Sequence, residues 1–297
     1  MDDAGRPTVG FVGLGAMGVP MALNIRRAGF PLVVHTRTAA RAAPVLEAGA
    51  TWADDPAGVA SRGDVVLTCL NTVDAVEGVY LAADGLVAAA RPGAVLVDHS
   101  TVSPALAQRI GEAARARGVH FLDAPVSGGP EGAAKGTLAI MVGGSAEGVE
   151  RALPVLGCYG ATIRRMGEVG AGTRAKLVNQ LLTFVHGAVA AEAIALAQAS
   201  GLDLASLAEV LRAGFAQSRM LDRTLARVTA HDYTAGASLA LYEKDLGLVQ
   251  AEGAAHALDL PVAAAARAIL REALQAGLAR HDIAALRLRY PDASQPA

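Results

Sequence analysis

The first half of the chain alternates short apolar runs, rich in β-branched residues, with longer alanine-rich stretches of helical character. Most of the apolar runs are bounded by Gly, Pro or Asp, and they predict buried strands at Thr8–Leu14, Pro31–His35, Val65–Leu70, Ala94–Asp98, Val119–Asp123 and Leu138–Val142. Strands that alternate with helices indicate a parallel sheet covered on both faces. Residues 1–169 are therefore expected to form a doubly wound α/β domain.

The pattern changes after a cluster of glycines, Gly167, Gly170 and Gly172, beyond which strand-like runs disappear. A long helix that closes at Gly201 is predicted first, and the helical runs are Ala171–Ser200, Leu204–Ala213, Leu239–His256 and Val262–Ala279. Residues 170–297 are thus expected to form an all-α domain that begins with a long interdomain helix. The small, polar tail after Tyr290 is expected to be frayed.

Composition and charge disfavour several classes of protein. The chain has 297 residues, of which 53% are hydrophobic and 18% charged, which is the balance of a globular protein. A net charge of −2 offers no basic surface for nucleic acid. The apolar stretch Phe184–Ala199 contains three polar side chains and is a poor membrane span, and the N-terminus leaves no room for a secretory signal. Cys69 and Cys158 are the only cysteines, so a reducing cytoplasm is the expected location.

A glycine-rich turn follows the first predicted strand. It fits the pattern G-x-G-x-x-G with Gly13, Leu14, Gly15, Ala16, Met17 and Gly18. In that pattern the first glycine allows a tight turn, the second lets the backbone approach a pyrophosphate, and the third lets the next helix pack close to the sheet. The alternative is an ordinary glycine turn, because a chain with 33 glycines produces chance matches. The strand before it and the helix predicted after it, at Ala16–Ala28, favour a dinucleotide-binding Rossmann domain.

The end of the second predicted strand bears on which nicotinamide cofactor is used. NAD-binding domains commonly have an acidic residue there for the ribose 2′-hydroxyl, but this chain reads His35-Thr36-Arg37-Thr38, with no acid before Glu47. Arg37 and Arg41 suit a 2′-phosphate, although a pair of solvated arginines is the alternative. NADP is therefore predicted, and NAD is less expected.

Three further segments, taken with the glycine turn and its continuation Met21-Ala22-Leu23-Asn24, carry a resemblance to a known family. They are Asp123-Ala124-Pro125-Val126-Ser127-Gly128-Gly129, Gly172-Thr173-Arg174-Ala175-Lys176-Leu177-Val178-Asn179 and Lys244-Asp245-Leu246. In this order, over nearly the whole chain, they resemble the β-hydroxyacid dehydrogenase family, typified by 3-hydroxyisobutyrate dehydrogenase. The resemblance implies a Rossmann domain followed by a helical domain of the 6-phosphogluconate dehydrogenase type.

Lys176 is the candidate catalytic residue. On a helix it shares a face with Asn179 and Gln180, and a partly buried lysine can have its pKa lowered towards neutrality, which suits proton transfer. The resemblance assigns Lys176 the proton of the substrate carbonyl or hydroxyl. A surface lysine at the start of a long helix is the alternative.

The resemblance also implies the rest of the site. The small residues after the strand that ends at Asp123 could hold a substrate carboxylate, although a flexible Ser-Gly turn is equally compatible with them. The implied substrate residues are Ser127, Gly128, Gly129, Asn179, Gln180 and Lys244, and the implied cofactor residues beyond the glycine turn are Thr36, Arg37, Thr38, Leu70, Asn71, Thr101, Lys244 and Asp245. The seven histidines show no metal-ligand spacing, so no metal is expected, and His99 and His186 are expected to be structural.

The sequence departs from the family pattern at two places. The family usually has two asparagines after the lysine, but the second is Gln180 here, and Ala237 stands where the family often has an aromatic residue. Both changes bear on the substrate pocket and leave the hydride chemistry untouched.

The resulting hypothesis is an NADP-preferring oxidoreductase that acts on a small β-hydroxyacid or its semialdehyde, of the 3-hydroxyisobutyrate, tartronate semialdehyde, succinate semialdehyde or glyoxylate type. Phosphogluconate dehydrogenases are disfavoured, because Thr173 and Arg174 stand where they usually have a histidine. Two alternatives remain: an imine reductase-like enzyme, and a non-catalytic NADP-binding sensor or scaffold. The retained Lys176 argues against both. A homodimer or homotetramer is expected, because helices that are apolar on most sides are usually buried.

Overall fold

The computed structural model describes residues 5–291, which form two compact units that meet between Lys176 and Leu177. This boundary lies inside the long helix α9 (Ala171–Ala199). The domain boundary expected from the sequence, between residues 169 and 170, stays a prediction. The part of the predicted frayed tail from Asp292 on lies outside the described residues.

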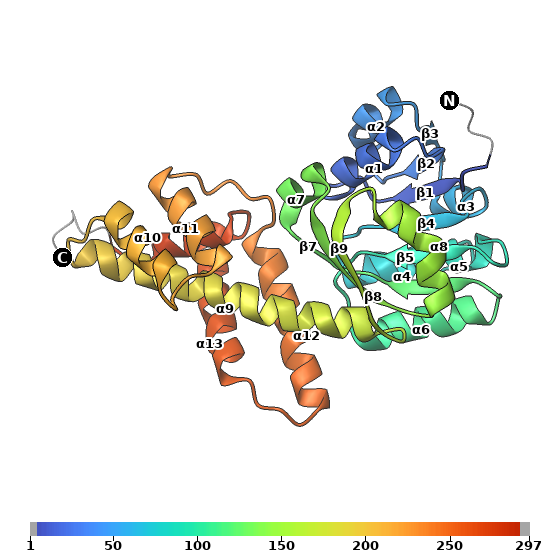
Figure 1. Cartoon of the computed structure of the whole chain (residues 1–297). Coiled ribbons are helices and arrows are strands. Elements are labelled where there is room, and N and C mark those ends of the chain that lie inside the picture. The colour runs from blue at the N-terminus through green and yellow to red at the C-terminus, as the bar shows by residue number, and fades with distance from the viewer. Residues whose placement is uncertain (1–4, 292–297) are drawn as a thin grey trace. The chain divides into compact units, whose positions relative to one another are not determined.

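The first unit is built on one sheet (Figure 1). Within residues 5–291 its nine strands are β1 (Val9–Val12), β2 (Leu32–His35), β3 (Thr51–Trp52), β4 (Val65–Thr68), β5 (Val95–Asp98), β6 (His120–Asp123), β7 (Val126–Ser127), β8 (Leu138–Gly143) and β9 (Gly160–Gly167). The first six pair in parallel in the order β3-β2-β1-β4-β5-β6. This is the strand order of a doubly wound dinucleotide-binding fold, and it confirms the predicted fold class.

The far end of the sheet differs from the expectation of a purely parallel arrangement. β8 pairs antiparallel with both β6 and β7, and it pairs in parallel with β9. The sequence pattern did not predict β3, β7 or β9. The first two are only two residues long, and most of β9 is exposed, with Arg164 and Arg165 in its middle.

Helices cover both faces of the sheet. They are α1 (Gly18–Arg27), α2 (Ala43–Glu47), α3 (Pro56–Ala60), α4 (Val73–Leu81), α5 (Leu86–Ala89), α6 (Pro104–Arg115), α7 (Gly129–Lys135) and α8 (Ala146–Leu156). Successive strand residues point to opposite faces. Phe11 and Leu67 therefore join a core that contains Met21 of α1, whereas Val66 joins a second core that contains Tyr80 of α4. These two cores fix the carboxyl edge of the sheet, where ligands bind in such folds.

The second unit is helical, as predicted. Beyond α9 it contains α10 (Leu204–Ala213), α11 (Arg219–Thr229), α12 (Leu239–Ala255) and α13 (Pro261–Ala273), then a π-turn (Leu274–Leu278) and a 3₁₀ helix (Ile283–Arg289). In its described part, β structure is limited to one isolated bridge between Thr234 and His281. α11 was not predicted, and the last predicted helix, Val262–Ala279, is α-helical only to Ala273, after which the π-turn contains Gly277 with a φ of +86°.

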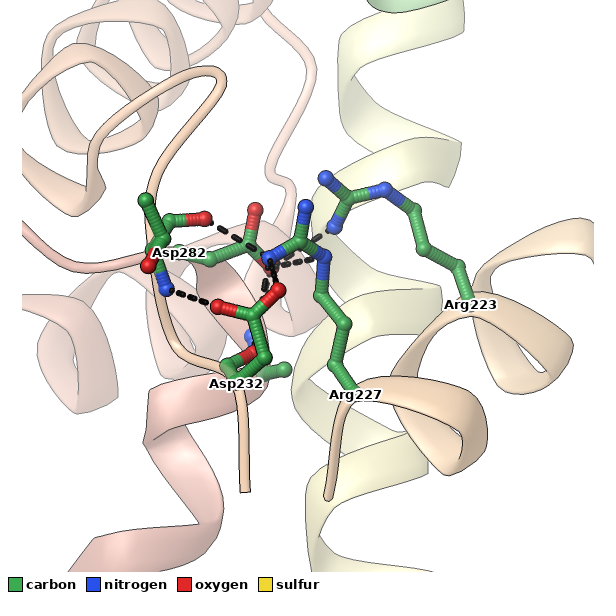
Figure 2. Close-up of polar contacts among 6 residues, drawn as sticks. Arg223, Arg227, Asp232 and Asp282 are labelled. Atoms are coloured by element: carbon green, nitrogen blue, oxygen red, sulfur yellow. Dashed lines mark hydrogen bonds and ion pairs between the residues drawn. The ribbon is translucent and has the colours of Figure 1, made fainter. Parts of the chain in front are cut away.

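A buried carboxylate joins three segments of the second unit. Asp282, which is fully buried, accepts a hydrogen bond from Arg223 Nη1 at 2.6 Å, and its Oδ1 lies 3.9 Å from Arg227 Nε. Arg227 Nη1 also lies 3.3 Å from Asp232 Oδ2. Figure 2 shows both arginines of α11 converging on the two aspartates. This Arg–Asp cluster (Arg223, Arg227, Asp232 and Asp282) holds α11 against the chain on either side of α12.

Helix α9 is, by length and composition alone, long and apolar enough to cross a membrane. Several of its apolar side chains, however, lie in the core of the second unit, among them Leu177, Phe184 and Ala188. A core helix of a folded domain meets the same criteria of length and hydropathy, and burial accounts for the apolar side chains on this face of α9. The expectation of no membrane partner remains a prediction.

Candidate active site

The glycine turn after β1 has the geometry that a dinucleotide requires. Gly13 has a φ of +100°, and a Cβ there would lie 2.5 Å from the Cys69 carbonyl oxygen. A Cβ on Gly18 would lie 2.0 Å from the Gly13 carbonyl oxygen, so only glycine allows α1 to begin so close to the strand. A Cβ on Gly15 would meet nothing within 4 Å. The backbone at Gly15 therefore faces open space, which fits a pyrophosphate at the N-terminus of α1.

The segment after β2 presents basic and hydroxyl side chains at the same edge of the sheet. Thr36 is buried, whereas Arg37, Thr38 and Arg41 are exposed. His35 Nδ1 lies 3.0 Å from the Ala53 carbonyl oxygen, which orients the imidazole across β2 and the segment after β3. This loop fits an anionic group and offers no carboxylate of its own.

Asp98 organises the ends of β4 and β5. Its Oδ1 accepts hydrogen bonds from Thr68 Oγ1 (2.7 Å), Ser100 N (3.0 Å) and Ser100 Oγ (2.6 Å). Ser100 Oγ in turn accepts a hydrogen bond from Leu70 N at 2.9 Å. Burial raises the pKa of Asp98 above its ordinary value, against the hydrogen bonds from Ser100 and Thr68 that lower it. Asp98 thus fixes the loops that contain Leu70, Asn71 and Thr101, which are candidate cofactor residues.

The sequence pattern did not single out Asp98. The available signal was an acid directly at the end of a fully buried strand, followed by Ser100-Thr101 at the carboxyl edge of the sheet. An ionisable side chain in such a position needs several hydrogen-bond donors, and these come from neighbouring strand ends.

His99 and Cys69 lie in this region and are both uncharged at neutral pH. His99 Nδ1 lies 2.6 Å from the Ala124 carbonyl oxygen and Nε2 lies 2.9 Å from the Tyr159 hydroxyl. Burial lowers the pKa of His99 to about 4, so at neutral pH the uncharged ring donates to Ala124 and accepts from Tyr159. Burial raises the pKa of Cys69 to about 12, which keeps it a thiol. No cluster of three metal-ligating side chains occurs within residues 5–291.

Lys176 and the turn that follows β6 lie together in the first unit. Lys176 is 7% exposed, and its Nζ donates a hydrogen bond to the Val126 carbonyl oxygen at 2.7 Å. The next residues are Ser127, Gly128 (φ +134°) and Gly129 (φ +65°), so the two glycines adopt conformations that other residues rarely reach. The ammonium group is therefore anchored beside the turn that is the candidate carboxylate site.

The remaining candidate residues gather in the second unit. Gln180 Nε2 donates to Asp245 Oδ2 at 2.5 Å, and Lys244 Nζ lies 2.9 Å from Asp245 Oδ1. Asn179 Nδ2 donates to Thr183 Oγ1 at 3.2 Å. Gln180 thus links α9 to the Lys244–Asp245 pair of α12, which the shorter side chain of an asparagine would reach less easily. Ala237 lies just before the start of α12.

Two family models match the chain, one for each unit. The model described as the NAD-binding domain of 6-phosphogluconate dehydrogenase matches residues 8–167. The model described as the NAD-binding domain of NADP-dependent 3-hydroxyisobutyrate dehydrogenase matches residues 170–289.

Individual proteins are similar over nearly the whole chain. An NAD-dependent L-serine dehydrogenase of Pseudomonas aeruginosa is 39% identical over 281 residues, which cover 92% of this chain and 94% of that protein. A solved 3-hydroxyisobutyrate dehydrogenase from Salmonella typhimurium is 33% identical with a TM-score of 0.88, over 96% of this chain and all of that one. The protein Psf3, solved with NADP+ and 2-OPP, is 30% identical with a TM-score of 0.89, over 95% of this chain and 99% of Psf3.

Imine reductases are more distant. An imine reductase from Pseudomonas sp. is 20% identical with a TM-score of 0.62, over 95% of this chain and 98% of that one, which is a likeness of fold. The matched models, the dehydrogenase relatives and the fold agree with the four sequence motifs. The chain belongs to the β-hydroxyacid dehydrogenase family and is an NAD(P)-dependent oxidoreductase.

Proposed function

We propose that this protein is an NADP-preferring enzyme that interconverts a small β-hydroxyacid and its semialdehyde, with Lys176 as the general acid and base. The observation that carries the proposal is the buried ammonium group of Lys176, 2.7 Å from the Val126 carbonyl oxygen and directly beside the Ser127-Gly128-Gly129 turn. A second support is the open backbone at Gly15, in the same unit.

The chemistry divides between the cofactor and the chain. The nicotinamide supplies or accepts the hydride when it is bound. The Ser127 hydroxyl and the backbone N–H groups of the turn hold the substrate carboxylate, which fixes the orientation of the reacting carbon. Good orientation can lower the activation free energy by roughly 7–11 kcal/mol. Lys176 donates a proton to the carbonyl oxygen in reduction and takes the hydroxyl proton in oxidation.

The test is a spectrophotometric panel. Both reduced cofactors are offered with 3-carbon and 4-carbon semialdehydes, glyoxylate and a cyclic imine, and both oxidised cofactors with the matching hydroxyacids. Cofactor turnover with at least one carboxylate-bearing substrate, and none with aldehydes that lack the carboxylate, is expected. Turnover confined to the imine would overturn the proposal in favour of the imine reductase alternative. Cofactor binding without turnover of any substrate would instead favour the NADP-binding sensor or scaffold.

The NADP preference can be tested separately. Arg37 and Arg41 are exposed beside the end of β2, where a 2′-phosphate would lie in this fold. Replacing both with alanine should weaken NADPH binding about tenfold or more, because charge-assisted hydrogen bonds are lost, and should change NADH binding less than about twofold. Arg109→Ala on α6, which breaks an exposed ion pair with Glu77, is the control. Equal losses for both cofactors would contradict the NADP preference.

The same proposal includes a homodimer or homotetramer. A row of exposed apolar side chains on α9 supports it: Val178 (61% exposed), Leu182 (52%), Val189 (53%) and Leu196 (70%). Their spacing puts them on one helix face, and such a row in a water-soluble chain usually marks a contact surface. Light scattering should give at least twice the chain mass, and Leu182→Glu should lower it; a monomer for the unaltered protein would contradict this part. A cytoplasmic location is proposed from the two free thiols.

A further inference from the structure

Asp123 forms a long-range cap on the helix that carries Lys176. It is 1% exposed at the end of β6, and its two carboxylate oxygens accept separate backbone hydrogen bonds. Gly170 N donates to Oδ1 at 2.8 Å and Thr173 N donates to Oδ2 at 2.7 Å. The first N–H groups of a helix have no partner within the helix, so a carboxylate that binds Thr173 N in the first turn and Gly170 N just before it fixes where α9 begins.

The first turn of α9 is seated directly on the sheet backbone. A Cβ on Gly172 would lie 2.3 Å from the Asp123 carbonyl oxygen and 2.4 Å from that of Met141. A Cβ on Gly143 of β8 would lie 2.3 Å from Asp123 Oδ1. Only glycine fits at either position. The carboxylate is therefore enclosed between the helix start and β8.

The segment that caps the helix also receives the lysine. Lys176 follows Thr173 by one helical turn, and its ammonium group bonds the carbonyl of Val126, three residues after Asp123. Asp123 therefore fixes the helix start at one end of this short segment, and Val126 fixes the ammonium group at the other. Ser127 of the candidate carboxylate site comes next in the chain.

We propose that Asp123 is the positioning residue for Lys176. It acts through the backbone of α9, and it sets the distance between the lysine ammonium and the Ser127-Gly128-Gly129 turn. The inference rests on the proposed role of Lys176. An acid at the head of this motif would repel the substrate carboxylate if its charge faced the Ser127-Gly128-Gly129 turn. Both of its oxygens face the helix start.

The test compares Asp123→Asn with an ordinary local cap elsewhere. Asparagine keeps one acceptor but turns an amide N–H towards a backbone N–H. Asp55 is the exposed local N-cap of α3, and one of its oxygens, Oδ1, accepts a hydrogen bond from Gly58 N at 2.6 Å. Asp123→Asn should lower kcat about 10- to 100-fold with NADPH affinity within about twofold, since a small displacement of a catalytic group is costly. Asp55→Asn should change neither by more than about twofold.

A double-variant cycle separates positioning from a merely structural cap. If Asp123 acts through Lys176, Asp123→Asn should cost less than about twofold in kcat when Lys176 is already alanine. Equal losses in both backgrounds, or an unchanged kcat for Asp123→Asn alone, would overturn the inference. Should Asp123→Asn not fold, Asp123→Ala removes both acceptor oxygens without adding an amide N–H and is read in the same cycle. An unchanged turnover for Lys176→Ala would instead contradict the proposed function.

Discussion

The first unit buries Asp98 and Asp123 among hydroxyl and backbone N–H donors, whereas the second unit buries Asp245 and Asp282 against the cations Lys244 and Arg223. Burial raises the pKa of both first-unit carboxyls. Backbone donors have one position each, so they hold a carboxylate in one place. Long cationic side chains can follow a carboxylate that moves. The first unit thus uses its acids to fix geometry, whereas the second uses its acids to join helices by charge, with one backbone donor added at Asp282, from Ala284 N at 3.1 Å.

The largest expected effect comes from breaking the Arg–Asp cluster of Figure 2. Asp282→Ala leaves Arg223 and Arg227 without the buried carboxylate and should lower the free energy of unfolding by about 3–5 kcal/mol, measured by urea denaturation. Asp222→Ala is the control, because it removes a partly exposed ion pair, 2.6 Å apart, between Asp222 of α11 and Arg212 of α10. That variant should lose about 1 kcal/mol or less. Equal losses would mean that burial does not distinguish the two pairs.

A smaller loss is expected from disturbing the backbone seat of α9. Gly172→Ala puts a methyl group into a space where backbone oxygens lie at 2.3 and 2.4 Å, so the helix start must shift. We expect about 1–3 kcal/mol of destabilisation in thermal or urea unfolding, together with reduced turnover. Gly78→Ala on α4, where a Cβ meets nothing within 4 Å, should instead stabilise by about 0.5–1 kcal/mol. Full stability and turnover in Gly172→Ala would show that the seat is not needed.

The smallest effect is expected at Asp98, and it depends on pH. All three donors reach Oδ1, so the amide oxygen in Asp98→Asn can replace it and the stability should change by only about 1 kcal/mol. Because the folded pKa of Asp98 is raised, its ionisation opposes folding at neutral pH, and that cost disappears as the pH falls through the folded pKa towards the unfolded value. The free energy of unfolding of Asp98→Asn, relative to that of the unaltered protein, should therefore be more favourable at about pH 7 than at about pH 4.

Urea unfolding at both pH values checks this prediction. A deficit for Asp98→Asn that stays the same, or grows as the pH rises, would mean that the buried charge itself stabilises the fold.

Local patterns in the sequence were enough for most of the first unit. Buried apolar runs predicted β1, β2, β4, β5, β6 and β8, and the glycine spacing predicted the turn at Gly13. α11 had a local signal that was not used: Leu221, Leu225 and Val228 recur at helical spacing after the N-cap Ser218. The cap on α9 had no local signal, since Asp123 is 47 residues from Gly170 and 50 from Thr173. The residue types could suggest Lys176 as the catalytic residue, but only the fold could show that Val126 anchors its ammonium group and that Asp123 caps its helix.

The most direct test of the account is the turnover of Lys176→Ala with the best substrate of the panel. Hydride transfer is followed by the nicotinamide absorbance, and cofactor affinity is measured by NADPH fluorescence. We predict a loss of about 10²-fold or more in turnover, with NADPH affinity within a few-fold of the unaltered protein. A variant that binds NADPH equally well and turns over at the original rate would contradict the account.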